Sequence, residues 1–140
     1  MSAFIANKTV SHSGVMTMLQ AAIDKANELG QPQCIVVVDA SGELLGEIRM
    51  TGAKFLSRKS ARAKALTAAS IGAPSHAIPE AVRSAIAAAT DGTVTGLPGG
   101  LPIKQDGTLV GGIGIGSGSG EQDIAVAQAA LDAIGADPIG

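Results

Sequence analysis

The sequence predicts an α/β protein of the α+β type, in which helices pack on a single antiparallel β-sheet. Two apolar segments, 34–50 and 101–115, each contain a turn sequence near the middle, which is typical of a β-hairpin. Longer segments around these hairpins carry apolar residues at helical spacing. Because tight turns join the neighbouring strands, those strands must run antiparallel.

Four segments are predicted to be helical. The first covers Ser13 to Leu29, where apolar residues recur every three or four positions until Gly30 and the sequence QP interrupt the pattern. The second covers Lys54 to Ile71 and is rich in alanine. A third, shorter helix is expected within SHAIPEAVRSAIAAA, residues 75–89, and the last runs from Glu121 to Ile134.

Two hairpins supply the strands. In the first, the β-branched stretch Ile35–Val38 is followed by DASGE, a turn sequence, and the chain returns through Leu44–Met50. The second, LPIKQDGTLVGGIGI, contains the turn pair Asp106-Gly107. Residues 90–100 are expected to form a loop with room for one more short strand. The whole chain, residues 1–140, is expected to be one domain.

The composition is unusual for a packed core. The chain has 19 glycines and two phenylalanines, with no tyrosine or tryptophan. Because small side chains each bury little apolar area, we expect further burial between subunits of a homo-oligomer. The formal net charge of −2 offers no basic surface for nucleic acid.

The first residues and the lengths of the apolar runs predict where the protein resides. MSAFIANKTVSHSG lacks the basic and apolar regions of a signal peptide, and no apolar run is long enough to span a bilayer. We therefore expect a cytoplasmic protein that does not bind membranes. Cys34, the only cysteine, excludes an internal disulfide and a cysteine-based zinc site, and is expected to pack inertly.

The glycine-rich segment GGIGIGSGSGEQD, residues 111–123, does not fit a nucleotide-binding loop. It matches neither G-x-G-x-x-G within a βαβ unit nor G-x-x-x-x-G-K-[ST]. Glu121 and Asp123 fall in the first turn of the predicted helix, where they would repel a phosphate. The glycines instead indicate close approach of backbones. The SGSG stretch would leave free N–H groups for a small anion such as a carboxylate.

The two histidines, His12 and His76, could each act as a general base or an axial ligand near neutral pH. The simpler alternative for both is an exposed residue near the start of a helix. Because only two histidines are present and no carboxylate pair lies beside them, we expect no dedicated metal site.

Basic residues occupy two faces of the second predicted helix. Lys54, Arg58 and Arg62 recur at every fourth position and so share one face, which is either solvated or an anion site. Lys64 lies on a different face among small apolar residues, where a lysine could serve in catalysis or in carboxylate binding.

Three further polar residues lie near the predicted turns. Arg49 ends the first hairpin, where its guanidinium could bind a carboxylate bidentately or pair with Glu43 or Glu47. Asp39 opens the turn of that hairpin, and forming the turn through its side chain is the alternative to a ligand role. Ser117 does not stand in a G-x-S-x-G sequence, so no nucleophile elbow is indicated.

Three stretches of the sequence resemble a known family. They are IVVVDASGELLGEIRMTGA, KALTAA and GGLPIKQDGTLVGGIGIGSGSGEQDIAVAQAAL, of which the last is long and specific. From His12 to Leu131 the chain is similar to the GlcG/HbpS family, which includes the C-terminal domain of PduO and is described as haem-binding or haem-degrading. The resemblance implies a profilin-like sheet and assembly into dimers or larger oligomers.

The resemblance also implies where a ligand binds. His12 stands just before the first predicted helix, where PduO-like members have a haem-coordinating histidine, so haem is the implied cofactor and His12 its implied iron ligand. Other matching positions lie in both hairpins and the second helix. We expect the ligand-binding residues to be His12, Asp39, Arg49, Lys64, Gly99, Gly100 and Ser117, with His12 and Lys64 as candidates for any catalysis.

Three functions are compatible with these features. The first is an accessory protein that binds haem or another small ligand. The second is a small catabolic isomerase, lyase or hydrolase, in which Arg49 and Lys64 hold the carboxylates of an organic acid and His12 or Lys64 moves protons. The third is a structural partner protein whose glycines serve only oligomer packing.

Overall fold

The computed structural model describes residues 2–140 and contains one four-stranded sheet. Its strand order is β2-β1-β4-β3, and every neighbouring pair is antiparallel, which confirms the predicted sheet. The strands are β1 (Cys34–Asp39), β2 (Leu44–Arg49), β3 (Gly100–Gln105) and β4 (Thr108–Gly116).

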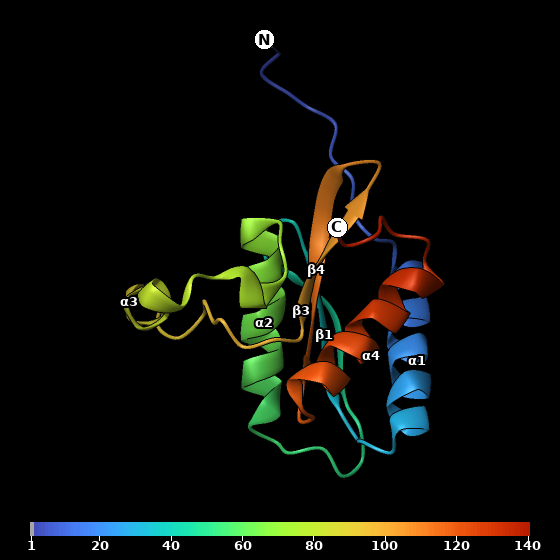
Figure 1. Cartoon of the computed structure of the whole chain (residues 1–140). Coiled ribbons are helices and arrows are strands. Elements are labelled where there is room, and N and C mark those ends of the chain that lie inside the picture. Colours follow the sequence, from blue (N-terminus) through green and yellow to red (C-terminus); the bar gives the residue numbers. More distant parts are fainter. Residues whose placement is uncertain (1) are drawn as a thin grey trace.

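Helices cover both faces of this sheet. They are α1 (His12–Leu29), α2 (Ser57–Ile71), α3 (Arg83–Ala89) and α4 (Gly120–Ala133). Helices α1 and α4 contact each other on one face, whereas α2 lies on the other (Figure 1). No helix within residues 2–140 is long and apolar enough to cross a membrane.

The larger apolar core lies between the sheet and the α1–α4 pair. Residues Ile35 and Val37 of β1 face this side, opposite Ile115 and Ile113 of β4. Helix α1 contributes a buried stripe at the three- and four-residue spacing that the sequence predicts: Val15, Met18, Ala22 and Ala26. Gly30, at a φ of 69°, ends this helix.

The second core, between the sheet and α2, is made of small side chains. On this face β4 presents glycines 112, 114 and 116, which pair with Val38, Val36 and Cys34 of β1. A Cβ atom at Gly114 would collide with the backbone of Ala61 and Ala65 in α2. The glycine run therefore brings the α2 backbone into direct contact with the sheet, the close approach that the sequence indicates.

The second hairpin closes at the predicted turn. Asp106 and Gly107 both have positive φ, 51° and 80°, as a two-residue hairpin turn requires. The Asp137 carboxylate accepts hydrogen bonds from the N–H groups of both residues, at 2.9 and 2.7 Å. The C-terminal segment is thereby tied to the tip of the hairpin.

Two predicted helices differ from the expected ones. Helix α2 begins at Ser57 rather than Lys54, because the chain before it makes single turns such as Ser57 N–H to the Lys54 carbonyl. The predicted helix at 75–89 is divided into two 3₁₀ turns, Ser75–Ala77 and Glu80–Val82, followed by α3. Pro79 causes this division, since proline has no N–H and disfavours helical backbone in the preceding residue. No strand forms within 90–99.

Helix α3 stands apart from the rest of the fold. It has seven residues, none of them buried, and it projects sideways beyond α2 (Figure 1). A helix this short is marginal in water without packing partners.

Replacing Gly114 by alanine tests the contact between α2 and β4. The added Cβ would meet backbone atoms of α2, which cannot move aside as a flexible side chain could. We expect the free energy of unfolding, measured in urea, to fall by about 1–3 kcal/mol or more. Gly140→Ala is the control, because nothing lies within 4 Å of a Cβ at that position. Equal stability of the two variants would contradict the close approach.

Candidate functional site

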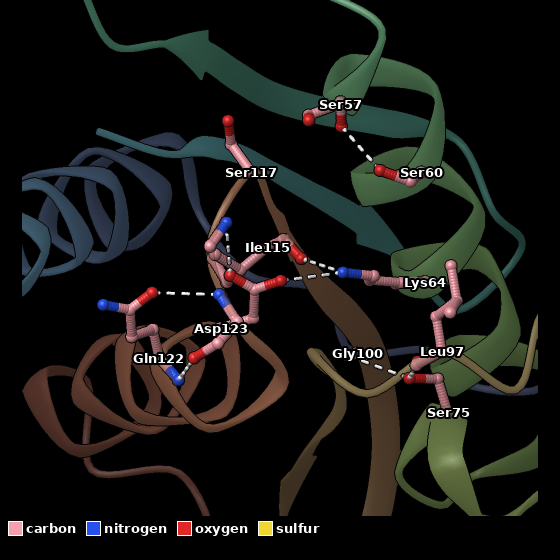
Figure 2. A network of polar contacts seen from close by, with 12 residues as sticks. Ser57, Ser60, Lys64, Ser75, Leu97, Gly100, Ile115, Ser117, Gln122 and Asp123 are labelled. Atoms are coloured by element: carbon pink, nitrogen blue, oxygen red, sulfur yellow. Dashed lines mark hydrogen bonds and ion pairs between the residues drawn. The ribbon is translucent and has the colours of Figure 1, made fainter. Parts of the chain in front are cut away.

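A buried ion pair joins the helices on the two faces of the sheet. The Lys64 ammonium of α2 lies 2.9 Å from Oδ2 of Asp123 in α4, and the exposed fractions of the two side chains are 6% and 3%. The same Nζ donates a hydrogen bond of 2.7 Å to the Ile115 carbonyl of β4 (Figure 2). Lys64 therefore has two partners for its three N–H bonds.

Burial dominates the electrostatics of Asp123. Desolvation raises the pKa of this carboxyl above its ordinary value, while the hydrogen bond and charge of Lys64 act in the opposite direction. The Gly118 N–H also lowers the pKa, by donating to Oδ1 at 3.1 Å. The Gln33 amide has a weaker influence in the same direction, although its geometry lies outside that of a hydrogen bond.

Gln33 itself is completely buried and polar. Neither its Nε2 nor its Oε1 has a hydrogen-bond partner among residues 2–140. Its amide lies beside Gly118, because a Cβ atom there would come within 2.5 Å of Gln33 Nε2 and 2.7 Å of Asp123 Oδ1. A buried amide without partners costs about 1–3 kcal/mol.

A cleft opens from the ion pair to the surface, and we call it the Lys64 cleft. Its volume is about 260 Å³. The N-termini of α2 and α4 and the loop before β3 form its walls (Figure 2). It is lined by Lys54, Ser57, Ser60, Lys64, Leu97, Pro98, Ser117, Gly118, Gly120 and Asp123.

Glycines 99 and 100 lie directly against Lys64. Gly99 has a φ of 121°, and a Cβ atom there would lie 3.2 Å from Lys64 Nζ. A Cβ atom at Gly100 would collide with the Lys64 carbonyl. The Ser75 hydroxyl holds this segment in place, since it accepts from the Gly100 N–H and donates to the Leu97 carbonyl.

Ser117 connects β4 to the turn before α2. It adopts a φ of 96°, and its Oγ accepts a hydrogen bond of 3.0 Å from the Lys54 N–H. Three N–H groups that follow it are occupied: Gly118 donates to Asp123, Ser119 to the Gln122 side chain, and Gln122 to the Ser119 hydroxyl. A capping box thus occupies part of the N–H groups predicted to be free in SGSG, while the Gly120 N–H has no acceptor among residues 2–140.

His12 lies at a second location, as the first residue of α1. Its side chain is exposed and makes no hydrogen bond to residues 2–140. The neighbouring Ser11 caps α1 and lines an open groove of about 420 Å³, which we call the N-terminal groove. Its lining is Lys8, Thr9, Val10, Ser11, Ile103, Lys104, Gln105, Val110, Ile134, Gly135 and Ala136.

The other predicted residues lie outside both hollows. The Asp39 carboxylate accepts from the N–H groups of Ser41 and Glu43, at 2.8 and 3.0 Å, and so builds the first hairpin turn. Arg49 is exposed at the end of the edge strand β2 and forms no ion pair with Glu43 or Glu47 within the described chain. Neither Arg49 nor His12 is among the residues that line the Lys64 cleft.

The remaining candidates lie either on the surface or, for Cys34, in the second core. Arg58 and Arg62 are exposed on α2, as is His76 beyond it. Cys34 is buried, and burial raises the pKa of its thiol. A neutral thiol at this position packs inertly.

Sequence reasoning found Lys64 and Ser117 but missed Asp123 and Gln33 as parts of one cluster. Asp123 lies 59 positions from Lys64 along the chain, and its place in the first turn of a helix already had a local explanation. Gln33, just before a buried strand, gave no periodic signal of burial.

Comparison with known proteins shows to which family the chain belongs. The family model described as haem degrading protein HbpS-like matches residues 10–132. The chain belongs to the HbpS-like family. This confirms the resemblance that the glycine-rich hairpin and the segment KALTAA indicate.

Individual HbpS-like proteins are similar over most of the chain. Corrinoid adenosyltransferase PduO of Salmonella typhimurium is 34% identical over 122 residues, which are 84% of this chain but only 36% of PduO. The crystal structure of a PduOC:heme complex superposes with a TM-score of 0.87 at 31% identity, over 93% of this chain and 98% of that one. For ORFY of Klebsiella pneumoniae the TM-score is 0.92 at 28% identity, over 96% and 97%.

Replacing Lys64 by methionine tests the electrostatics of Asp123. Loss of the ammonium removes the largest influence that lowers the pKa of Asp123, so we expect this pKa to rise above its wild-type value. Carboxyl ¹³C NMR titration measures it directly. The exposed Lys59→Met is the control and should leave the pKa of Asp123 unchanged.

The same shift determines how stability depends on pH. Because the folded pKa of Asp123 is raised, the folded protein retains this proton to a higher pH than the unfolded chain does. The contribution of Asp123 to stability is therefore full below the unfolded pKa and is lost as pH rises through the folded pKa. In Lys64→Met this loss should extend to higher pH. An unchanged titration of Asp123 would show that Lys64 does not act on it.

Proposed function

We propose that this HbpS-like chain is a haem-binding accessory protein with His12 as the iron ligand. The observation that carries the proposal is an exposed imidazole, free of hydrogen bonds to residues 2–140, at the start of α1; His12 directly follows Ser11, which lines the N-terminal groove, although His12 is not itself part of that lining. Imidazole is the most frequent protein ligand of haem iron. The similarity to the PduOC:heme complex supports the same cofactor.

The lining of the N-terminal groove has the chemistry that haem needs. Ile134 provides half-exposed apolar surface for a porphyrin face, above Ile103 and Val110, which are almost completely buried beneath the groove. Lys8 and Lys104 provide two ammonium groups that would pair with propionates. A hydrogen bond from Lys8 to Gln105, at 3.1 Å, already fixes Lys8 against the β3–β4 hairpin.

Each of these residues has a separate role in holding the cofactor. His12 would bind the iron through one ring nitrogen, the lysines would orient the propionates, and the apolar residues would exclude water from one face. The bound haem would supply the redox or oxygen chemistry that gives the family its description. Because the groove is open, we propose that a second copy of the chain covers the other face.

Haemin titration of the purified protein tests this proposal. We expect a Soret band that saturates near one haem per subunit in the wild type. His12→Ala should lose or shift the band, because its iron ligand is gone. With no tyrosine or tryptophan, protein concentration is read from peptide absorbance.

His76→Ala is the matched control, since His76 is also exposed but lies beyond α2. It should titrate like the wild type. A wild type that never saturates would refute haem binding, whereas a wild-type spectrum in His12→Ala would refute only the choice of ligand.

We also propose that the chain is a homo-oligomer in which α3 packs against another copy. The support is the exposure of α3: seven residues rich in alanine, none buried, projecting from the body. Packing on a partner would supply the tertiary contacts that so short a helix needs. The scarcity of large core side chains favours the same arrangement.

Introducing a charge on α3 tests this assembly. Ala88 is exposed, so Ala88→Arg should leave the subunit folded while placing an unpaired guanidinium in the subunit interface. We expect light scattering to report a smaller species than for the wild type. Ala133→Arg, exposed at the end of α4, should assemble normally. A wild-type mass for Ala88→Arg would place the interface elsewhere.

A further inference from the structure

We propose that the Lys64 cleft binds a small organic carboxylate, in a site distinct from the N-terminal groove. The two hollows share no lining residue. The proposal rests on the charge, the spare hydrogen-bonding capacity and the size of the cleft.

The charge of the lining favours an anion. Lys54 and Lys64 carry positive charges, and Asp123 carries the single negative one, so the ionised lining has an excess of one positive charge. The Asp123 carboxylate is already engaged by Lys64 and by the Gly118 N–H. An incoming carboxylate would therefore meet Lys54 and the free side of the Lys64 ammonium.

The buried Lys64 ammonium retains one hydrogen-bond donor. Two of its three N–H bonds go to Ile115 and Asp123, and no other acceptor within residues 2–140 takes the third. The absence of a side chain at Gly99 keeps the space beside Nζ open, since a Cβ atom there would lie only 3.2 Å away. A buried ammonium with a free donor in a cleft is a ready partner for a carboxylate oxygen.

The buried Gln33 amide is an independent indication of a missing partner. It lies against Gly118, which lines the cleft, and neither of its polar atoms has a hydrogen-bond partner among residues 2–140, although Gln33 is not itself part of the lining. Buried amides are normally hydrogen-bonded, so the polar groups directly behind the cleft are incompletely satisfied in the absence of a ligand.

The start of α2 adds to the attraction for an anion. Its first turn contains no acidic residue and its N-cap, Leu56, offers no side-chain hydrogen bond. The Ser57 and Ser60 side chains of this turn line the cleft. The first N–H groups of α2, from Ser57 to Lys59, are already bonded to carbonyls of the preceding turn, so this terminus contributes its dipole and not free donors. The positive end of the α2 dipole therefore faces the cleft without an internal counter-charge.

Size and apolar walls distinguish an organic carboxylate from an inorganic anion. A volume of about 260 Å³ is below the range of drug-sized pockets and suits a small organic acid. Leu97 and Pro98 form one wall, and Leu97 is half exposed. Covering this wall would be favourable for a short hydrocarbon chain and not for phosphate.

An NMR titration of the haem-free full-length chain with sodium propionate tests the proposal. We expect saturable shifts of the Gly118, Gly120 and Ser57 amides, with a dissociation constant in the millimolar range. Amides of Thr9 and Val10 in the N-terminal groove should not respond. Sodium phosphate and sodium chloride at matched ionic strength should bind more weakly. Shifts with phosphate but none with propionate would overturn the proposal.

Two exposed lysines of similar position supply the decisive comparison. Lys54 lines the cleft, whereas Lys59 lines a separate surface hollow together with Glu47. Lys54→Gln should weaken propionate binding about two- to fivefold, the effect of one exposed charge, while Lys59→Gln should leave it unchanged. Equal affinities would overturn the proposal.

A second variant blocks the space itself. Ser57 is half-buried at the mouth of the cleft, so Ser57→Leu should fill the cleft and abolish the shifts. Because Lys54 is exposed, Lys54→Gln keeps the test decisive even if Ser57→Leu does not fold. A failure of haemin binding would leave this result unaffected, and the reverse also holds.

Discussion

The direct contact between the α2 backbone and strand β4 is the constraint on which the other features depend. Glycines 112 and 114 of β4 meet Ala61, Ala65 and Ala69 of α2, so the two backbones pack with at most methyl groups between them, and Gly116 meets the serines at the start of α2. Close-packed atoms gain dispersion energy whatever their residue type, and alanine loses no side-chain entropy on burial. This explains how a chain with two phenylalanines and no tryptophan can still form a layered core.

That contact also places Lys64 at the site. A helix so close to the sheet brings the next face of α2 to the end of β4, where the Lys64 ammonium reaches the Ile115 carbonyl. The chain then turns through Ser117 into α4, which carries Asp123 back to the same point from the opposite face of the sheet. The ion pair thus passes round the end of the sheet, through space that Gly99 leaves open.

Features that depend on local sequence were predictable, and those that depend on distant contacts were not. The Asp106-Gly107 turn, the α1 stripe and the glycine run each have a local cause, and the structure contains all three. Pro79 shows the limit of this reasoning, because its effect on the neighbouring backbone outweighs the helical composition around it. The apolar neighbours of Lys64 indicate a functional role for this lysine, but its partner Asp123 comes from another helix and is not indicated by them. Nor does the sequence indicate that Arg49 lies outside the Lys64 cleft, because this follows from the position of β2 at the edge of the sheet.

A smooth interface has a mechanical property that its stability does not reveal. Interdigitated side chains resist both separation and sliding, whereas a row of glycines under a row of alanines resists mainly separation. Packed helices in other proteins shift along such surfaces by shear. In this fold the Lys64 side chain crosses the interface and its ammonium is bonded to β4 and α4 together. These bonds oppose sliding of α2 along the sheet. A ligand that displaced Asp123 or the Ile115 carbonyl from this ammonium would remove the contact that opposes such sliding.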